Sequence, residues 1–322
     1  MEDEKHFSWA VRPQTLKEYI GQQDIKDKLK VSISAAKQRQ EPHEHVLLHG
    51  PPGLGKTTLS LIIANEMKAN LVSTSGPALK APQDLFGILT NIQKYDVLFI
   101  DEIHRLSKSL EEYLYSAMED FKIDFIIEKN GKNKTITIPV KPFTLIGATT
   151  QSGKLSGPLR TRFGISHHLK FYTNDELEQI VKRSAGEYNI IIDDESAKAI
   201  AVRSRGTPRT ANRLLRRVRD YADFDSAKRI TIDCVVKTMN LEKIDHLGLD
   251  ELDRQFLQTI HDVYKGGPVG INAIAATLNE EVNTFTDTVE PYLLQIGLLA
   301  RTKTGRKLTD KAQAYLNLKP TM

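Results

Sequence analysis

Residues 50–57 read Gly-Pro-Pro-Gly-Leu-Gly-Lys-Thr and match the pattern G-x-x-x-x-G-K-[ST] at every fixed position. The apolar run at residues 46–48 precedes this stretch and predicts a buried strand, while residues 58–67 follow it as a predicted helix. In such a setting, the glycines let successive backbone N–H groups turn toward an anion, and the helix N-terminus adds a partial positive charge. The stretch therefore predicts a phosphate-binding loop at the end of a buried strand.

A second stretch, residues 96–102, reads Asp-Val-Leu-Phe-Ile-Asp-Glu, the pattern of a buried strand that ends in two carboxylates. With the loop, it predicts a nucleoside triphosphate site in which Lys56 reaches the β- and γ-phosphates and Thr57 and Asp101 hold Mg²⁺. Glu102 is expected to polarise the water that attacks the γ-phosphate. The alternative is that the two acids only cap a helix. We interpret His104 as structural, since no Cys or second His stands at metal-ligand spacing.

The composition is that of a globular protein of two or three domains: 322 residues, 40% hydrophobic and 27% charged. The single cysteine excludes an intramolecular disulfide framework and suits a reducing cytoplasm. We expect no secretory signal and no membrane span, because the first residues are acidic and no apolar stretch approaches about 18 residues. The net charge of +4 permits nucleic acid as a partner without requiring it.

The segment before the first strand, residues 6–20, combines aromatic and apolar residues without a long period, and Pro13 argues against a continuous helix. Two interpretations stay open, a clamp over a planar base and an arm packed on the core. An amphipathic helix is predicted at residues 24–37.

A β-hairpin is predicted from residues 125–128 and 134–138, with Asn-Gly in the turn. Ile136 and Ile138 share one face of the return strand, and Ile126 or Ile127 adds to that face from the partner strand. This apolar face either packs on its own domain or is presented to another protein.

A buried strand at 143–150 ends in hydroxyls, and a loop at 157–164 carries arginines beside Gly, Pro and Phe. Near residue 170 the pattern changes to helices, predicted at 177–188 and 194–202 and from Pro208 to Arg219. We interpret the arginine-rich run at 203–219 as mostly a solvated or ion-paired face. Arg209 differs because it stands at a helix start, after Thr-Pro.

After a predicted linker at 240–250, helices are predicted at 252–263, 273–278 and 283–295, followed by two strands at 297–302 and 305–309. Three helices and a two-stranded wing form a winged-helix pattern. Its tip carries a cluster suited to phosphate contacts: Arg301, Lys303, Arg306 and Lys307. An ordinary solvated hairpin is the alternative.

Several longer blocks carry a resemblance to a family: residues 50–58, Asp-Glu-Ile-His-Arg-Leu at 101–106, Gly-Ala-Thr-Thr at 147–150, Pro-Leu-Arg-Thr-Arg-Phe-Gly-Ile at 158–165 and Arg-Gly-Thr-Pro-Arg at 205–209. Their spacing resembles the AAA+ ATPases. With residues 12–22 and the winged-helix tail, they resemble the bacterial RuvB family of Holliday-junction branch-migration motors. The resemblance implies an α/β P-loop large domain with a parallel sheet at 1–169, a hairpin insertion at about 124–139, an all-helical lid at 170–243 and a winged helix at 244–322.

The resemblance also implies roles for matching residues. Thr150 would be the polar sensor at the strand end, with Thr149 as the alternative. Arg162 would be an arginine finger that acts on ATP held by a neighbouring subunit, and Arg209 a second sensor. The nucleotide-binding set would be Val11, Arg12, Gly53, Gly55, Lys56, Thr57, Thr58, Glu119, Asp120, Phe121, Tyr172, Pro208 and Arg209.

The implied partners are ATP or ADP, Mg²⁺, the duplex arms of a four-way junction, a junction-binding RuvA protein docked on the hairpin and a RuvC resolvase in the wider complex. The subunits would form a hexameric ring in the cytoplasm. The Leu-Arg-Thr-Arg-Phe finger region and the lone Cys234 argue against a clamp-loader-like ATPase. The combination of Glu102 and Arg162 argues against a DNA-binding regulator that ATP only switches.

Overall fold

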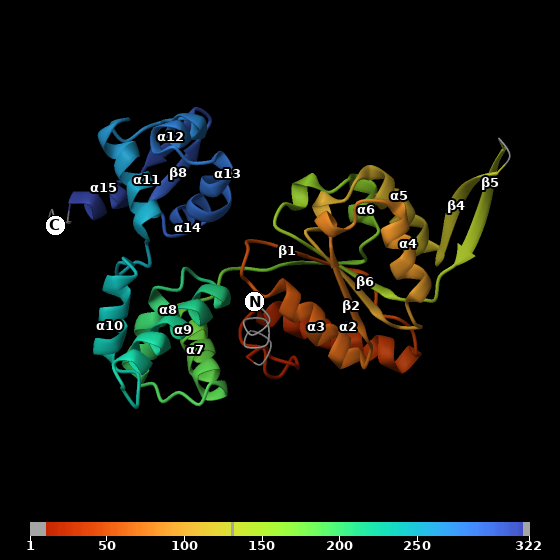
Figure 1. Cartoon of the computed structure of the whole chain (residues 1–322), viewed down its shortest axis with the longest axis horizontal. Helices are drawn as coiled ribbons and strands as arrows, with labels where there is room; N and C mark the ends of the chain where they lie inside the picture. Colours follow the sequence, from red (N-terminus) through yellow and green to blue (C-terminus); the bar gives the residue numbers. More distant parts are fainter. Residues whose placement is uncertain (1–10, 130–131, 318–322) are drawn as a thin grey trace. The chain divides into compact units, whose positions relative to one another are not determined.

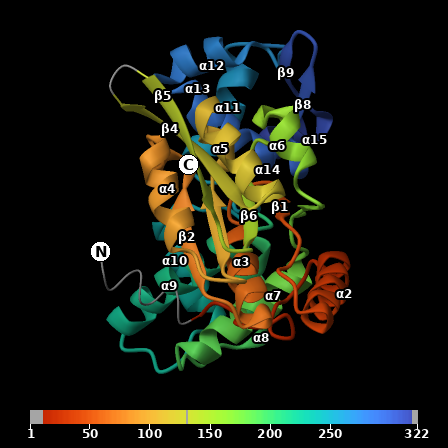
Figure 2. The same cartoon turned by 90° about the vertical axis from the view of Figure 1, so that its right-hand side faces the viewer.

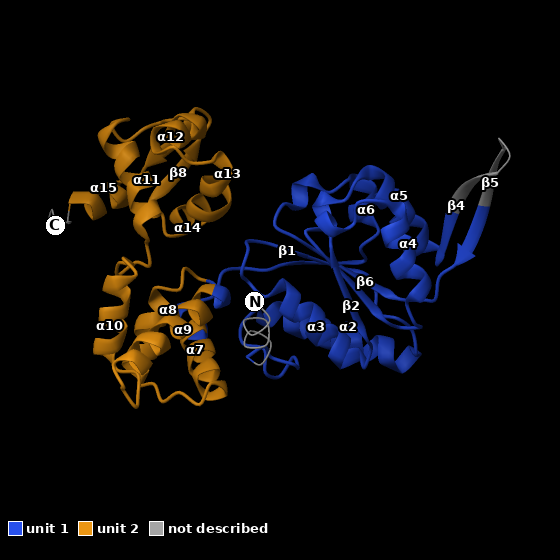
Figure 3. Cartoon of the chain, in the orientation of Figure 1, with its two compact units in different colours: residues 1–176, 207–209 blue, residues 177–206, 210–322 orange. Residues whose placement is uncertain are grey.

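A computed structural model of the chain describes residues 11–129 and 132–317, without the side chains of residues 125–135 (Figure 1). The chain divides into two compact units, coloured separately in Figure 3. The first contains residues up to 176 together with 207–209, and the second contains 177–206 and the residues from 210 onward. Among the described residues, none of the helices combines the length and the apolar character needed to cross a bilayer.

The first unit is built on a five-stranded parallel sheet with the order β2-β3-β6-β1-β7. The strands are β1 (Val46–His49), β2 (Leu71–Ser75), β3 (Val97–Asp101), β6 (Thr144–Thr149) and β7 (Ile165–His168). The central strands β3 and β6 are buried almost throughout, because helices cover both faces of the sheet. The predicted parallel α/β domain is confirmed.

Helices α2 and α3 cover one face of this sheet, and α4, α5 and α6 cover the other (Figures 1 and 2). Their bounds are α2 (Gln23–Arg39), α3 (Lys56–Met67), α4 (Pro82–Asn91), α5 (Lys108–Glu119) and α6 (Gly157–Thr161). Leucines of α4 and α5 share one core with the apolar side chains of β3 and β6. Short 3₁₀ turns η1 (Gly76–Ala78), η2 (Ile103–Arg105) and η3 (Ser152–Lys154) follow β2, β3 and β6.

The register of the parallel strands brings the predicted site to one edge of the sheet. His49 at the end of β1 pairs with Thr149 at the end of β6, and Ile100 of β3 pairs with Gly147 of β6. The loop after β1, the acids at the end of β3 and the hydroxyls at the end of β6 therefore leave the sheet side by side.

The hairpin is a separate two-stranded sheet of β4 (Lys122–Lys129) and β5 (Lys132–Pro139), which extends away from the rest of its unit (Figures 1 and 2). Both strands are longer than predicted. At the base of the hairpin, Ile123 and Val140 are buried.

Apart from the first residues of α7 and α9, the second unit contains the helices α7 (Asn174–Glu187), α8 (Asp194–Val202), α9 (Pro208–Phe224) and α10 (Ile232–Leu241). A winged-helix part follows, made of α11 (Glu251–Asp262), α12 (Ile271–Leu278), α13 (Val282–Thr284), the π-helix η4 (Phe285–Val289), α14 (Glu290–Gln295), β8 (Leu299–Thr302), β9 (Gly305–Leu308) and α15 (Asp310–Asn317). It has its own apolar core, which includes Phe256, Phe285 and Leu293.

Four elements differ from the predictions. The segment predicted as a loop at 157–164 contains α6, which Ser156 opens by accepting a hydrogen bond from the backbone of Leu159. Strand β7, helix α10 and helix α15 were not predicted. Helix α10 ends at Leu241, inside the predicted linker at 240–250. Val235 and Met239 are buried, which gives this helix an apolar face packed in the unit.

Candidate nucleotide site and DNA-binding wing

The loop at 50–57 has the conformation that its glycines allow. Gly53 and Gly55 have φ angles of 80° and 97°, in the left-handed region that side chains disfavour. A Cβ at Gly55 would lie 2.9 Å from the Tyr19 hydroxyl, and a Cβ at Gly53 would lie 3.1 Å from the Cβ of Arg209. The first turn of α3 follows directly, so the N–H groups of Lys56, Thr57 and Thr58 lack partners within the helix. These features form a cradle for phosphates.

Lys56 lies inside this cradle. Its side chain is buried, and Nζ donates hydrogen bonds to the carbonyl oxygens of Gly50 and Pro51, both at 2.9 Å. Burial lowers the pKa of Lys56 to about 8, although the nearby charge of Asp101 acts in the opposite direction. A phosphate anion would provide the countercharge that this ammonium group lacks.

Two tyrosines, Tyr19 and Tyr172, contact the phosphate-binding loop. The hydroxyl of Tyr172 donates to that of Tyr19 at 2.8 Å, and both hydroxyls lie within hydrogen-bond reach of the Leu54 carbonyl. Burial raises the pKa of Tyr172 to about 12. Tyr172 belongs to the predicted nucleotide-binding set, whereas Tyr19 was missed, although it lies in the aromatic segment before the first strand.

Arg209 and Arg12 also lie near the loop. The backbone N–H of Arg209 donates to the Gly53 carbonyl at 3.3 Å, directly after Pro208 begins α9. The pKa of Arg12 is lowered, first by burial and then by the positive charge of Arg209. Val11 is buried. The structure thus brings the cationic part of the predicted set together beside the phosphate cradle.

The acids at the end of β3 have distinct environments. An oxygen of Asp101 accepts a hydrogen bond from the Glu102 backbone at 2.9 Å. The Glu102 backbone is left-handed, with φ 48°, and its carboxylate accepts a hydrogen bond from Arg105 at 3.1 Å. Both members of this ion pair are about half exposed, so the pair is easily broken.

The residues present fit a magnesium ion. Mg²⁺ is usually held by one or two protein groups together with phosphate oxygens and water. The Thr57 hydroxyl and the Asp101 carboxylate are such groups, and the described residues contain no cluster of three or more His, Cys, Asp or Glu that would form an all-protein cage. A bound Mg²⁺ would neutralise charge on the phosphates as the bond to the γ-phosphate breaks.

The two candidate polar sensors at the end of β6 differ in exposure. Thr149 is buried, and its hydroxyl is 2.9 Å from Nδ1 of His104 and accepts from the Gln151 backbone at 2.9 Å. Thr150 is exposed. His104 therefore connects the loop after β3 to the end of β6, whereas Thr150 is exposed and its role as the polar sensor stays a prediction.

Arg162 follows α6 and is held by α5. Its guanidinium forms an ion pair with Glu119 at 3.1 Å, lies 4.4 Å from the ring centre of Tyr115 and donates to the Pro158 carbonyl at 3.0 Å. Asp120 and Phe121, the two residues after Glu119, make other contacts. Asp120 pairs with Lys122 at 3.0 Å, and Phe121 packs edge-on against Phe143 in the core.

The wing presents a more complex cluster than the sequence indicates. Arg301 and Arg306 both donate to the carboxylate of Glu290, which is fully buried. The Arg301 side chain is 54% exposed, but that of Arg306 is only 17% exposed. Lys303 and Lys307 are exposed. Glu290 was missed because it lies on α14, away from the wing in sequence.

The structure describes the side chains of only some of the hairpin residues predicted to bind a partner. Ile136 is 37% exposed, and Ile138 is half-buried opposite Ile123. Ile126 and Ile127 lie outside the described side chains.

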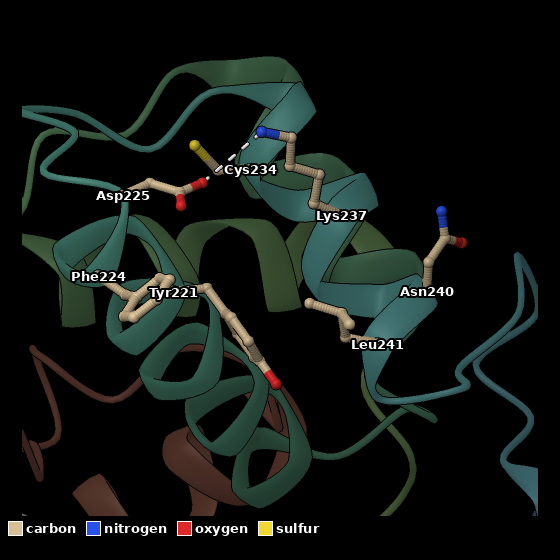
Figure 4. Close-up of a pocket in the computed structure, with 7 residues that line it drawn as sticks. All are labelled: Tyr221, Phe224, Asp225, Cys234, Lys237, Asn240 and Leu241. Carbon is tan, nitrogen blue, oxygen red and sulfur yellow. Dashed lines mark ion pairs between the residues drawn. The ribbon is translucent and has the colours of Figure 1, made fainter.

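A hollow of about 450 Å³ lies in the second unit, between the end of α9 and α10 (Figure 4). Its rim carries the ion pair of Asp225 and Lys237 at 3.6 Å and the exposed side chains of Phe224 and Leu241. None of the predicted site residues lines it.

Comparison with known proteins finds three family models that together cover most of the chain. Residues 11–169 match the family model described as the Holliday junction DNA helicase RuvB P-loop domain. Residues 172–245 match the RuvB AAA lid domain, and residues 246–317 match the RuvB C-terminal winged helix domain.

Full-length relatives agree with this assignment. The chain is 52% identical over 316 residues to the Holliday junction branch migration complex subunit RuvB of Pediococcus pentosaceus, covering 98% of this chain and 94% of the relative. It is 55% identical over 306 residues to the protein of the same name from Thermotoga maritima, with 95% and 92% covered.

Among solved structures, that of the Thermotoga maritima RuvB Holliday junction branch migration motor matches with a TM-score of 0.87 and 52% identity, over 97% of this chain and all of that one. The fold class predicted from the sequence, P-loop domain, lid and winged helix, is therefore confirmed. With a complete phosphate cradle, paired acids at the adjacent strand end and matches over nearly its whole length, the chain belongs to the RuvB family of AAA+ ATPases.

Proposed function

We propose that this protein is an ATP-driven motor that moves the branch point of four-way DNA junctions. Copies of the chain form a hexameric ring in the cytoplasm, and a RuvA-type protein holds the junction while the ring moves a duplex arm. A RuvC-type resolvase acts in the wider complex. The relatives' names support the junction as substrate.

In this proposal, the phosphates of ATP lie in the cradle at residues 50–57, where Lys56 exchanges its two carbonyl hydrogen bonds for phosphate oxygens. Glu102 leaves Arg105 and accepts a proton from the attacking water as the water oxygen bonds to the γ-phosphorus and the bond from that phosphorus to the β,γ-bridging oxygen breaks, with ADP as the leaving group. Thr150, whose side chain is exposed, orients the water or the phosphate. Arg209, in the first turn of α9, reports the γ-phosphate to that helix.

One observation carries the oligomeric part of the proposal. Within the described part of the chain, the guanidinium of Arg162 contacts Glu119, Tyr115 and Pro158, on α5 and α6, and these contacts involve neither the cradle nor Glu102. The guanidinium is thus held in place by its own subunit without serving that subunit's phosphate cradle. This arrangement supports an arginine finger that completes the site of a neighbouring copy.

Exposed side chains on two hairpins, β8–β9 and β4–β5, provide the proposed contacts with DNA and with the partner protein. Arg301, Lys303 and Lys307 present cations at the wing, and Arg306 supports them. Phosphate contacts of this kind do not depend on base sequence, which suits a motor that must move along any duplex. Ile136, exposed on the hairpin of β4 and β5, is proposed to dock on the RuvA-type protein together with Ile126, Ile127 and Ile138.

The experiment that tests this function is ATP-dependent separation of a synthetic four-way junction, with and without the RuvA-type protein. We expect separation that needs hydrolysable ATP and is strongly enhanced by the partner. DNA-stimulated ATP hydrolysis without any junction separation would instead identify a loader. DNA binding that responds to ATP without turnover would identify a switch.

A further inference from the structure

The turn between α8 and α9, residues 203–207, joins two parts of the chain that the proposed function assigns to ATP and to DNA. On its C-terminal side, residues 207–209 belong to the unit that carries the phosphate cradle. There, the Arg209 backbone donates to the Gly53 carbonyl. On its N-terminal side, the turn is attached to the winged-helix part.

Arg205 makes that attachment. Its two terminal nitrogens donate to both oxygens of Asp253, at 2.9 and 3.1 Å. One nitrogen also donates to the carbonyl of Thr288 at 3.0 Å. The guanidinium lies 4.8 Å from the ring centre of Tyr292. A single side chain thereby binds α11, η4 and α14, three elements of the winged-helix part.

The contact is built into the fold and is not a surface pair. The Asp253 side chain is fully buried, and that of Arg205 is only 12% exposed. Asp253 also accepts from the backbone of Asp250 in the capping box that begins α11. Arg205 itself has a left-handed backbone, φ 54°, which the same contacts hold in place.

A backbone contact strengthens the same connection. Gly248, with φ 77°, approaches the Arg203 carbonyl so closely that a Cβ there would lie 2.5 Å from its oxygen. The turn is therefore joined to the winged-helix part at residues 203 and 205, and to the cradle four residues later. A single residue, Gly206, separates Arg205 from the segment at 207–209.

We propose that Arg205 is the coupling residue through which ATP-dependent movement at Arg209 is passed to the winged-helix part. This inference rests on the proposed function, because it requires that the winged helix works on DNA. The side-chain contacts of Arg205 given above are with the winged-helix part, so in this proposal it acts by position. Its bidentate geometry suits this role. Two hydrogen bonds from the planar guanidinium fix both the position and the orientation of the Asp253 carboxylate, whereas a single ammonium contact would leave its orientation free.

Two conservative variants test the proposal. Arg205→Lys keeps the charge and loses the fork, and Asp253→Asn keeps the shape and loses the charge. The matched control is Arg217→Lys, because Arg217 lies on α9 in an exposed pair with Asp220 at 3.6 Å. Each variant is assayed for thermal unfolding, ATP binding, duplex binding, ATP hydrolysis and junction separation with the RuvA-type protein present.

We expect both conservative variants to keep ATP binding and duplex binding, and to separate about tenfold fewer junctions per ATP hydrolysed, within the range of measured couplings between sites. The control should match the wild type. The inference is overturned if both variants keep the wild-type ratio. It is equally overturned if hydrolysis, DNA affinity and thermal stability all fall together, because Arg205 would then serve folding alone.

Failure of the underlying function would look different. In that case, the wild-type protein itself would hydrolyse ATP without separating junctions, and the variants would not be needed to show it.

Discussion

Arg162 and Glu119 form an ion pair at 3.1 Å on the surface of the P-loop unit, with the ring of Tyr115 stacked against the guanidinium. The Arg162 side chain is 23% exposed, whereas that of Glu119 is 56% exposed. The arginine is thus oriented before any partner arrives. If Arg162 acts as the proposed arginine finger, such preorganisation reduces the cost of ordering the guanidinium against a γ-phosphate.

We predict that Arg162→Ala lowers ATP turnover by about 10³–10⁵-fold, the range measured for arginine fingers. If the residue acts on a neighbouring subunit, mixing this variant with Lys56→Ala subunits restores part of the activity. In a mixed ring, some interfaces combine an intact cradle with an intact finger. Each variant alone, at the same total concentration, is the control. The absence of recovery at every mixing ratio would place the finger in its own subunit's site.

The sequence was sufficient to predict elements whose signal is local. The cradle and the strand that ends in Asp101 each depend on residues close together in the chain, and the parallel sheet then brings their ends to one edge. The roles of individual site residues remain predictions. Thr150 illustrates what the structure adds, because only burial distinguishes it from Thr149, whose hydroxyl is engaged with His104.

Long-range pairs could not be predicted in the same way. Arg205 and Asp253 are separated by 48 positions, and the arginine lies in a run that resembles an ordinary solvated face. Glu290 likewise gives no sign in the sequence that it will meet two arginines of the wing. Short elements were also missed. Helix α6 has only five residues, too few for a helical period to show.

Lys56 predicts a pH dependence of ATP binding. Its pKa in the nucleotide-free protein is lowered from 10.5 to about 8, chiefly by burial. Phosphates favour the charged form, so the pKa is higher in the complex and binding takes up a proton above pH 8. Affinity for ATP should therefore be insensitive to this group below pH 8 and fall above it, by at most about tenfold per pH unit.

Calorimetric titration of ATP between pH 6.5 and 9.5 measures this effect. The control is Lys56→Arg, whose guanidinium stays charged over this range and should remove the dependence on pH. In the nucleotide-free protein, the effect of Lys56 on folding stability changes with pH in the direction opposite to its effect on ATP affinity. Because the folded state binds fewer protons than the unfolded state between pH 8 and 10.5, this group increases stability as the pH rises through that window. Constant ATP affinity up to pH 9.5 would show that the lysine is not titrating.

Glu102 is predicted to act as the base. Glu102→Gln should bind ATP normally and lose hydrolysis by about 10²–10⁴-fold, since the amide cannot accept the proton of water. Arg105→Ala is the matched control, because it removes the partner of the same carboxylate without removing the base. Its effect should be small, as exposed ion pairs contribute about 0–1 kcal/mol. Single-turnover hydrolysis and fluorescent-nucleotide binding separate the two results. Undiminished turnover in Glu102→Gln would assign the base elsewhere.

The wing arginines should behave differently from each other when replaced. Arg301 is 54% exposed, so Arg301→Ala should weaken duplex binding equally for all sequences and lower the slope of log affinity against log salt by about one. Arg306 is mostly buried against Glu290. Removal of either arginine leaves the buried carboxylate of Glu290 with one partner in place of two. Because Arg306 is the more buried partner, its removal should mainly destabilise the winged helix, by at most about 3–5 kcal/mol, and by more than removal of Arg301.

Salt-dependent DNA binding and thermal unfolding, measured side by side, distinguish these two effects. Lys303→Ala provides the comparison, since its exposed ammonium should reduce the salt slope without changing stability. If Arg301→Ala binds duplex with unchanged affinity and slope, the DNA contact lies outside the wing. If instead Arg306→Ala alters only the slope and leaves the unfolding temperature unchanged, then the carboxylate of Glu290 does not depend on Arg306. In that case Arg306 would serve as a phosphate contact in its own right.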